Sequence, residues 1–310
     1  MSLSIVIPVF NEEETLPHTH QRLTRLTESA ELASFRPIEI IYVNDCSRDS
    51  SAKVLSKLKS EKLPHTEVRV LEFSKNFGHS AAVLAGLEAC KGDLISIIDA
   101  DLQDPPELIP QMLARIGAGF DVVYGKRISR EKESWFKKFT AWAFYRLLNS
   151  LAGGSIPKDT GDFRVMTQEV RDALLRCQEQ DPFLRGLVAW VGFRQEAFPY
   201  VREGRKYGET KYPFKKMLKF ALLALVSFSS LPLRMALYVG FLGLIFVLGI
   251  GAWAAFAYFD GRAIPGWTSL LLGYLAGQSI TLVLVGVIGV YVGRIFSEVR
   301  GRPRYILRRS

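Results

Sequence analysis

Ser4-Ile-Val-Ile-Pro-Val-Phe10 is a short and almost entirely apolar run, rich in branched residues, that ends at Asn11-Glu-Glu-Glu14 and leads into a helical pattern. Comparable runs follow at residues 38–43, 68–73, 94–98 and 121–124, each separated from the next by a segment long enough for a helix. Short buried strands that alternate with helices are typical of an α/β fold. The sequence therefore predicts a Rossmann-like domain with a mainly parallel sheet.

Polar residues directly follow each of the first four predicted strands. The four segments are Pro8 to Glu12, Asn44 to Asp49, Ser74 to Gly78 and Asp99 to Gln103. One such segment alone would be a turn or a helix cap. Because the carboxyl ends of parallel strands meet at one edge of a sheet, where open α/β sheets bind ligands, the four together predict a binding site there.

The segment Asp99-Ala-Asp-Leu-Gln103 is the most specific of these motifs. Asp99, Asp101 and Gln103 offer hard oxygen ligands at alternate positions, which suits Mg²⁺ or Mn²⁺. Such an ion would bridge the diphosphate of a nucleotide and neutralise a leaving group. A D-x-D pair is common by chance in turns, but this one follows an apolar strand and precedes Asp104-Pro-Pro106.

The C-terminal third of the chain is strongly apolar. Residues 235–259 and 266–293 contain no charged side chain, and each stretch is long enough to cross a hydrocarbon core of about 30 Å. The connection at 260–265 is short and the basic residues lie on the outer flanks, so we expect a transmembrane hairpin with both termini in the cytoplasm. Two buried helices of a soluble core are the alternative, which the length without a charge disfavours.

Residues 212–234 begin with three lysines and then run apolar until Pro232 interrupts them. This pattern predicts amphipathic helices that lie in the membrane interface, with a third span as the alternative. The second apolar stretch also contains repeated small residues, which permit close helix packing and hint at a homo-oligomer. These are Gly273, Gly277, Gly286, Gly289 and Gly293.

The formal net charge of +9 arises largely from basic residues on both sides of the apolar region. That distribution indicates an anionic membrane surface or a phosphorylated ligand, and no nucleic acid. The scattered Cys46, Cys90 and Cys177 are typical of reduced cytosolic thiols. No basic segment precedes the N-terminal apolar run, so we do not expect a signal peptide, and the first domain should stay in the cytoplasm.

The motifs together resemble the family 2 glycosyltransferases with a GT-A fold, and within them the polyprenyl-phosphate glycosyltransferases such as bactoprenol glucosyltransferases and dolichol-phosphate mannose synthase. The resemblance rests on the four strand-end segments and on Gly161-Asp-Phe-Arg-Val-Met166, Gly208-Glu-Thr-Lys-Tyr212, Ser227-Phe-Ser-Ser-Leu-Pro-Leu-Arg234 and residues 293–305. Cys46 stands where the family usually has glycine. The resemblance implies a GT-A domain at 1–211, juxtamembrane amphipathic helices at 212–234 and a two-helix hairpin with a basic cytoplasmic tail at 235–310.

The resemblance also implies roles for individual residues. The nucleotide sugar would be held by Pro8, Glu12, Asp45, Ser47, Asn76, Asp99 and Asp101, with Arg202 and Arg205 on a loop that closes over the donor. The divalent metal would be held by Asp99, Asp101 and Gln103. The Gln-x-x-Arg-Trp motif of processive synthases does not occur here, which favours transfer of a single sugar.

A lipid phosphate acceptor is largely ionised at neutral pH, so it needs a cationic cradle more than a general base. The predicted lipid-phosphate ligands are Arg127, Arg130, Lys137, Lys138 and Lys211, of which Arg127 is the best candidate for catalysis. A solvated helix face is the alternative for the others. Asp162 is the second catalytic candidate, to orient the acceptor or take a residual proton, with a structural cap as its alternative. One displacement would invert the anomeric carbon.

The predicted donor is UDP-glucose and the predicted acceptor undecaprenyl phosphate, as in the O-antigen or lipopolysaccharide modification that the resemblance implies. N-acetylglucosamine, GDP-mannose and an aminoarabinose derivative are the alternative donors, because no single residue reports on a sugar hydroxyl. A catalytically silent scaffold would lack the metal motif. Two uncharged spans disfavour a channel or transporter. The resemblance further implies a bacterial inner-membrane location, a downstream flippase and a periplasmic glycosyltransferase.

Overall fold

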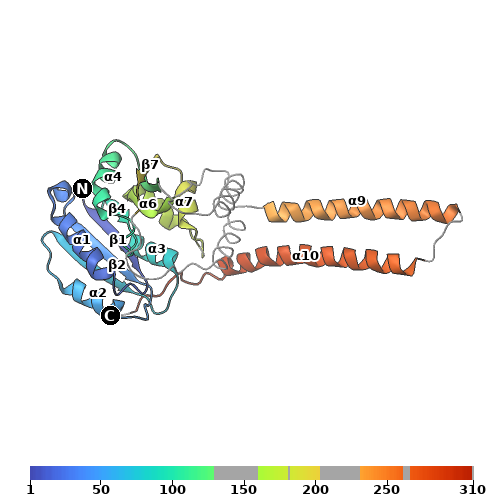
Figure 1. Cartoon of the computed structure of the whole chain (residues 1–310), viewed down its shortest axis with the longest axis horizontal. Coiled ribbons are helices and arrows are strands. Elements are labelled where there is room, and N and C mark those ends of the chain that lie inside the picture. The colour runs from blue at the N-terminus through green and yellow to red at the C-terminus, as the bar shows by residue number, and fades with distance from the viewer. Residues whose placement is uncertain (129–159, 181, 203–230, 261–265, 309–310) are drawn as a thin grey trace. The chain divides into compact units, whose positions relative to one another are not determined.

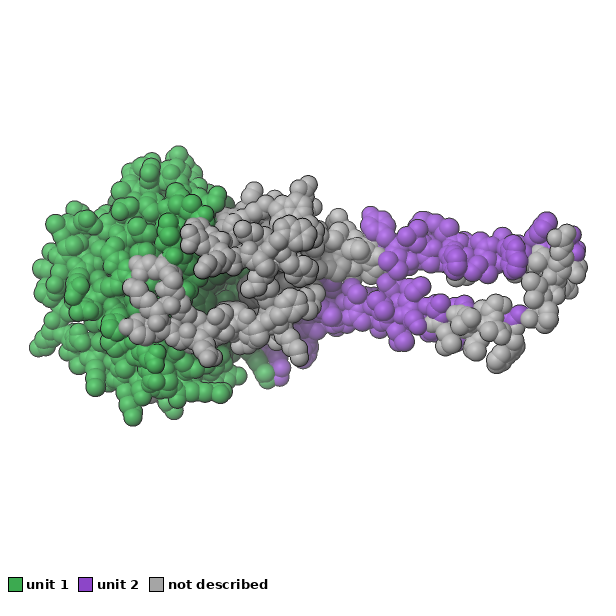
Figure 2. All heavy atoms as spheres, viewed as in Figure 1, with its two compact units in different colours: residues 1–149, 153–213, 302–310 green, residues 150–152, 214–301 purple. Residues whose placement is uncertain are grey.

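The computed structural model describes residues 1–128, 160–180, 182–202, 231–260 and 266–308. The chain divides into two compact units (Figure 2): Met1–Asn149, Gly153–Pro213 and Arg302–Ser310 form the first, and Ser150–Ala152 and Phe214–Gly301 the second. The predicted domain boundary after residue 211 lies outside the described residues, and the one after residue 234 falls inside a helix. The segment after residue 301 belongs to the first unit although it follows the second in the chain.

The first unit is built on one seven-stranded sheet (Figure 1). Its strands are β1 (Leu3–Val9), β2 (Ile38–Asn44), β3 (Thr66–Glu72), β4 (Leu94–Ile97), β5 (Val122–Arg127), β6 (Thr160–Thr167) and β7 (Gln195–Tyr200), in the order β3-β2-β1-β4-β6-β5-β7. Only β6 runs antiparallel to its neighbours. The predicted α/β fold with a mainly parallel sheet is therefore confirmed, whereas β6 and β7 were not predicted.

Helices cover both faces of this sheet, and β1 supplies alternate side chains to two apolar cores. The elements are α1 (Leu16–Glu28), η1 (Ala30–Phe35), α2 (Ser51–Ser60), α3 (His79–Ala89), η2 (Pro106–Leu108), α4 (Ile109–Gly117), α6 (Gln168–Arg176) and α7 (Leu184–Trp190). Apolar residues of α1, α2 and α4 line one core, and those of α3, α6 and α7 line the other. In α3, a Cβ added to Gly86 would lie 2.2 Å from Val6 Cγ1, so this glycine lets α3 approach β1 closely.

The pairing of the central strand β1 with β4 ends before its pairing with β2. Its pairing with β4 ends at Val6↔Ile97, whereas its pairing with β2 continues to Val9↔Asn44. Pro8 lies beyond the last β4 pair, where its missing N–H interrupts no ladder on that side. Since the chain runs from β1 to β2 on one side and meets β4 on the other, the ends of β1 and β4 form the switch point at which α/β sheets bind ligands.

The described part of the second unit consists of two helices that pack against each other, α9 (Leu231–Phe259) and α10 (Trp267–Val299) (Figure 1). By length and composition, Ala276–Val299 is long and apolar enough to cross a membrane, and none of it is buried inside the protein. α9 contains a shorter apolar stretch, Tyr238–Trp253. One of the two predicted spans thus meets this criterion within the described residues, and the hairpin stays a prediction.

The residues that follow α10 pack on the edge of the first unit's sheet. The Ser74 N–H donates to the Ile306 carbonyl at 3.0 Å, and the Arg308 N–H donates to the Glu72 carbonyl at 2.7 Å, which extends pairing at the end of β3. The Tyr305 ring stacks on Phe73 with 5.1 Å between ring centroids, and its hydroxyl donates to Glu88. The basic tail, predicted only as a cytoplasmic extension, is therefore an edge cover for β3.

Replacing Tyr305 by alanine should release this tail, because the mutation removes both the ring contact with Phe73 and the hydrogen bond to Glu88. We expect faster tryptic cleavage after Arg304 and Arg308, measured by mass spectrometry of the detergent-solubilised protein. Tyr305→Phe is the matched control because it keeps the stacked ring, and its cleavage should be intermediate. Equal protection in all three proteins would contradict the proposed anchoring by Tyr305.

His20 is a buried titratable residue of α1, and its ring nitrogens lie 2.9 Å from the Tyr42 hydroxyl and 3.2 Å from Glu61 Oε2. Burial lowers the pKa of His20 below its ordinary value of 6.5, although the charge of Glu61 opposes this shift. The folded state consequently prefers neutral His20, while the unfolded chain protonates it near its ordinary value.

The stabilisation that follows from this preference is present above pH 6.5 and is lost as the pH falls through the lower folded-state pKa. We therefore expect the melting temperature of the wild type to fall between pH 7.5 and pH 5 more than that of His20→Gln. The control is His18→Gln on the same helix, which is exposed and should follow the wild type. An identical pH profile for His20→Gln and the wild type would contradict this account.

Candidate active site

The loops that follow β1 and β2 are tied to each other by side chains that bond to the opposite backbone. The Asn11 N–H donates to Ser47 Oγ at 3.0 Å, and the Arg48 N–H donates to Asn11 Oδ1 at 2.8 Å. Glu12 contributes its N–H to Ser51 Oγ at 2.9 Å. Cys46 has φ +55°, the left-handed region that favours glycine, which is the residue usual in the family at this position. These hydrogen bonds therefore join the two loops at the ends of β1 and β2.

Asp45 connects these loops to the loop before α3. Its Oδ1 and Oδ2 accept the backbone N–H groups of Phe77 and Gly78 at 2.7 and 2.9 Å, and its carbonyl accepts from Asn76 Nδ2 at 3.3 Å. Burial raises the pKa of Asp45, although the two backbone hydrogen bonds oppose the rise. In this structure the carboxylate holds a loop in place, so a direct contact between Asp45 and a nucleotide stays a proposal.

Three carboxylates, those of Asp99, Asp101 and Asp104, follow β4, and the last two have partners at the end of β7. Arg202 lies 3.7 Å from Asp101 Oδ2 and donates through Nε to Asp104 Oδ1 at 3.2 Å. The same oxygen of Asp104 accepts the hydroxyl hydrogen of Tyr200. Burial raises the pKa of Asp99 to about 6, and the neighbouring carboxylates add to that rise. The loop thus concentrates negative charge that a cation would neutralise.

The residues of this loop fit a divalent metal. Asp104 Oδ2 is buried without a hydrogen-bond partner among the described residues, and Asp99 and Asp101 supply hard oxygen ligands. Within those residues, no group of three or more His, Cys, Asp or Glu side chains is arranged to hold a metal ion. Mg²⁺ usually takes one or two carboxylates together with substrate phosphates, so two aspartates suffice for an ion that arrives with a nucleotide. Gln103 donates its backbone N–H to Asp101 Oδ1 at 3.1 Å.

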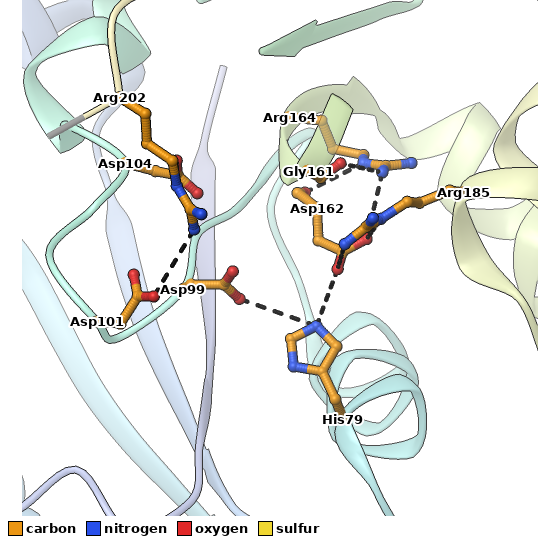
Figure 3. A network of polar contacts seen from close by, with 9 residues as sticks. All are labelled: His79, Asp99, Asp101, Asp104, Gly161, Asp162, Arg164, Arg185 and Arg202. Carbon is orange, nitrogen blue, oxygen red and sulfur yellow. Dashed lines mark hydrogen bonds and ion pairs between the residues drawn. The ribbon is translucent and has the colours of Figure 1, made fainter. Parts of the chain in front are cut away.

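Asp162 lies inside β6, so the alternative in which it caps a helix is wrong. Arg185 donates hydrogen bonds to both carboxylate oxygens of Asp162, at 3.1 Å each, and His79 Nε2 lies 3.1 Å from Asp162 Oδ2 (Figure 3). Burial alone would raise the pKa of Asp162, but the charge of Arg185 and the hydrogen bonds hold that pKa well below its ordinary value. Burial would lower the pKa of His79, but Asp162 and Asp99 raise it to about 9. The cluster is therefore a fixed ion pair, and Asp162 is a weak base.

Arg127 ends β5 and packs against the residue before Asp162. A Cβ added to Gly161 would lie 2.7 Å from Arg127 Nη2, so a side chain at this position would displace the guanidinium. Arg127 also contacts the Tyr200 hydroxyl, which links it to the acidic loop through Asp104. The structure thus brings the predicted catalytic pair, Asp162 and Arg127, into one neighbourhood.

The remaining predicted site residues divide into two groups. At or directly after the ends of the first four strands, as the pattern predicted, lie Pro8, Glu12, Asp45, Ser47, Asn76, Asp99, Asp101 and Gln103. Arg202, which only the resemblance implied, follows β7. Arg130, Lys137, Lys138, Arg205 and Lys211 lie outside the described residues. Four further residues belong to the network but were not predicted: His79, Asp104, Arg164 and Arg185 (Figure 3). The first three stand in or beside quoted motifs, whereas nothing in the sequence marks Arg185.

Comparison with known proteins identifies the class of enzyme. The family model described as Glycosyl transferase family 2 matches residues 4–175, which include β1 to β6 and both aspartates of the acidic loop. The chain is a family 2 glycosyltransferase. It is 44% identical over 312 residues to the uncharacterized glycosyltransferase YkcC of Bacillus subtilis, covering 99% of this chain and 93% of that protein.

Two relatives carry more specific names. This glycosyltransferase is 37% identical to the prophage bactoprenol glucosyl transferase homolog of Escherichia coli, which covers 100% of this chain and 99% of that protein. It is also 37% identical to the bactoprenol glucosyl transferase of Shigella phage SfII, over 100% of this chain and 98% of that protein. Similarity extends over both units, so it includes the apolar helices.

Solved structures resemble it more distantly. TarS of S. aureus in complex with UDP-GlcNAc superposes with a TM-score of 0.47 at 16% identity and covers 73% of this chain and 67% of that chain. The mannosyltransferase PcManGT of Pyrobaculum calidifontis, solved with GDP-Man and Mn²⁺, gives a TM-score of 0.47 at 17% identity, over 94% of this chain and 86% of that chain.

Replacing Asp45 by asparagine should loosen the crevice of this glycosyltransferase, because an amide nitrogen would face a backbone N–H of Phe77 or Gly78. We expect the free energy of unfolding to fall by about 1–3 kcal/mol. Chemical denaturation of the detergent-solubilised protein measures this, with the exposed Asp172→Asn in α6 as the matched control. Unchanged stability with weaker UDP binding would instead place Asp45 in direct contact with the nucleotide.

Proposed function

We propose that this glycosyltransferase transfers a single glucose from UDP-glucose to a polyisoprenyl phosphate, such as undecaprenyl phosphate, at the cytoplasmic face of a bacterial membrane. The observation that carries the proposal is the full-length similarity to proteins named bactoprenol glucosyl transferases. Because the relative at 44% identity is named only as a glycosyltransferase, the same reaction with another sugar is the second candidate.

The acidic loop and Arg202 support binding of the donor. Bound at Asp99 and Asp101, a divalent ion supplies charge neutralisation for the departing diphosphate. Arg202, which lies beside Asp101 and Asp104, is placed to contact the same diphosphate. Asp104 is almost completely buried and accepts hydrogen bonds from Arg202 and Tyr200, which hold these two side chains in position.

The chemistry requires one displacement. A phosphate oxygen of the acceptor attacks the anomeric carbon and forms a new C–O bond, while the bond from that carbon to the β-phosphate oxygen breaks and UDP leaves with the electron pair. The second pKa of a phosphate monoester is about 6, so no proton has to be removed from the attacking oxygen at neutral pH. Attack opposite the leaving group inverts the anomeric configuration.

Asp162 has a positioning role in this scheme. Its carboxylate is ionised and already accepts hydrogen bonds from Arg185, with His79 at hydrogen-bond distance, which makes it a poor proton acceptor. Arg127 is the candidate for direct contact with the acceptor phosphate, because it ends β5 beside Gly161.

The membrane arrangement follows from α10 and the tail. Ala276–Val299 would span the bilayer, and the residues directly after α10 belong to the first unit. The C-terminal end of α10 would therefore lie on the cytoplasmic side with that unit. With α9 as the second span, the hairpin places both termini in the cytoplasm.

The first test is transfer of radiolabel from a panel of UDP- and GDP-sugars to undecaprenyl phosphate, by purified protein in detergent with Mg²⁺ or Mn²⁺. We expect label to enter the organic phase from UDP-glucose. Label from a different donor would correct the sugar and retain the reaction. Absence of transfer from every donor, with UDP binding intact, would refute the proposed function.

In the same assay, Asp101→Ala should lower kcat by about 100-fold or more, because the carboxylate that holds the metal and faces Arg202 is lost. The control is Asp172→Ala, an exposed aspartate of α6, which should retain wild-type turnover. If the wild type remained active in excess chelator, that result would contradict the proposed metal dependence.

A further inference from the structure

His79 and Arg185 are two cationic side chains at the site for which the proposed reaction assigns no substrate contact. Both lie within 3.1 Å of the Asp162 carboxylate. The side chains of His79 and Arg185 are 40% and 35% exposed, whereas that of Asp162 is 10% exposed. The carboxylate therefore lies beneath the two cations, whose outer sides face solvent.

Three basic side chains, those of Arg164, Arg185 and His79, surround the carboxylates of Asp162 and Asp99. Arg164 is 4% exposed and its Nη2 lies 3.5 Å from Asp162 Oδ1. The side chain of Arg185 is 35% exposed, and an Arg fork is well suited to phosphate oxygens.

The position of the cluster indicates which anion it would bind. Figure 3 shows Arg202 and Asp101 on one side of Asp99, and His79, Asp162 and Arg185 on the other. The bridging contact is His79 Nε2, which lies 3.8 Å from Asp99 Oδ1. In an inverting displacement the attacking and departing oxygens lie on opposite sides of the anomeric carbon. With the departing diphosphate beside Arg202, the attacking phosphate belongs beside His79 and Arg185.

We propose that His79 and Arg185 bind the phosphate of the acceptor lipid, and that Asp162 is the buried carboxylate that holds both in place. This inference rests on the proposed function, since it assigns the acceptor subsite of that reaction. It also gives Asp162 a reason to stay ionised, because a protonated Asp162 would no longer hold two cations at the rim. Arg185 touches the substrate in this scheme, whereas Asp162 is a positioning residue.

The test measures binding of farnesyl phosphate and of farnesol to the full-length protein in detergent, together with binding of UDP. The wild type should prefer the phosphate. Arg185→Gln should weaken farnesyl phosphate binding by about tenfold or more, with farnesol and UDP binding unchanged. Arg185→Lys should retain part of the preference. Arg115→Gln is the matched control, because Arg115 is an exposed arginine at the end of α4 that pairs only loosely with Glu196, at 3.8 Å.

Two outcomes for Arg185→Gln would overturn the assignment. If the variant loses UDP binding but keeps its preference for farnesyl phosphate, the donor diphosphate binds at this cluster. If neither UDP binding nor the phosphate preference changes, Arg185 has a purely structural role. If the melting temperature shows that Arg185→Gln does not fold, Arg185→Lys and His79→Gln decide in the same assay. Because these measurements need no turnover, they separate the two proposals. A wild type that prefers farnesyl phosphate but transfers no sugar would refute the proposed function and leave this phosphate site standing.

Discussion

Mutual repulsion of carboxylates in a small space is the constraint on which the site depends. Asp99, Asp101 and Asp104 follow one strand directly, and Asp162 adds a fourth charge from β6. Burial and these neighbours raise the pKa of Asp99 to about 6. Such a group is tolerable only with cations around it, and the protein supplies them on two flanks: Arg202 on one, and the His79 and Arg185 pair on the other. The carboxylates between these two flanks are the ones that fit a divalent cation.

The sheet creates this concentration through its topology. β1 separates from β4 after Val6 and remains paired with β2 to Val9, which opens the crevice at Pro8. β6 then enters antiparallel, with Ile97 opposite Arg164. Asp99 lies two residues after Ile97 and Asp162 two residues before Arg164, so both aspartates lie at the same end of the antiparallel pair, and His79 at the start of α3 contacts both.

This geometry explains which features the sequence could predict. The strands up to β5 and the polar segments behind the first four follow from local patterns, since an apolar run and the residues after it are adjacent in the chain. β6 was not predicted, because Gly161-Asp-Phe-Arg164 mixes charged and apolar residues and owes its strand to buried pairing with β4 and β5. Arg185 was missed for the same reason. Its partner Asp162 lies 23 residues away in sequence, and only the tertiary fold brings the two together.

The tail after α10 also depends on contacts between residues that are far apart in the sequence. Its backbone pairs with residues 72–74, immediately before Asn76, Phe77 and Gly78, whose bonds to Asp45 shape the crevice. α3 begins at the next residue, His79. The chain that leaves the apolar helix therefore contacts the loop that is bonded to Asp45 and leads into His79. In the proposed reaction the donor is soluble and the acceptor lies in a bilayer, so the segment that follows α10 would link the apolar helix to the loop that precedes His79.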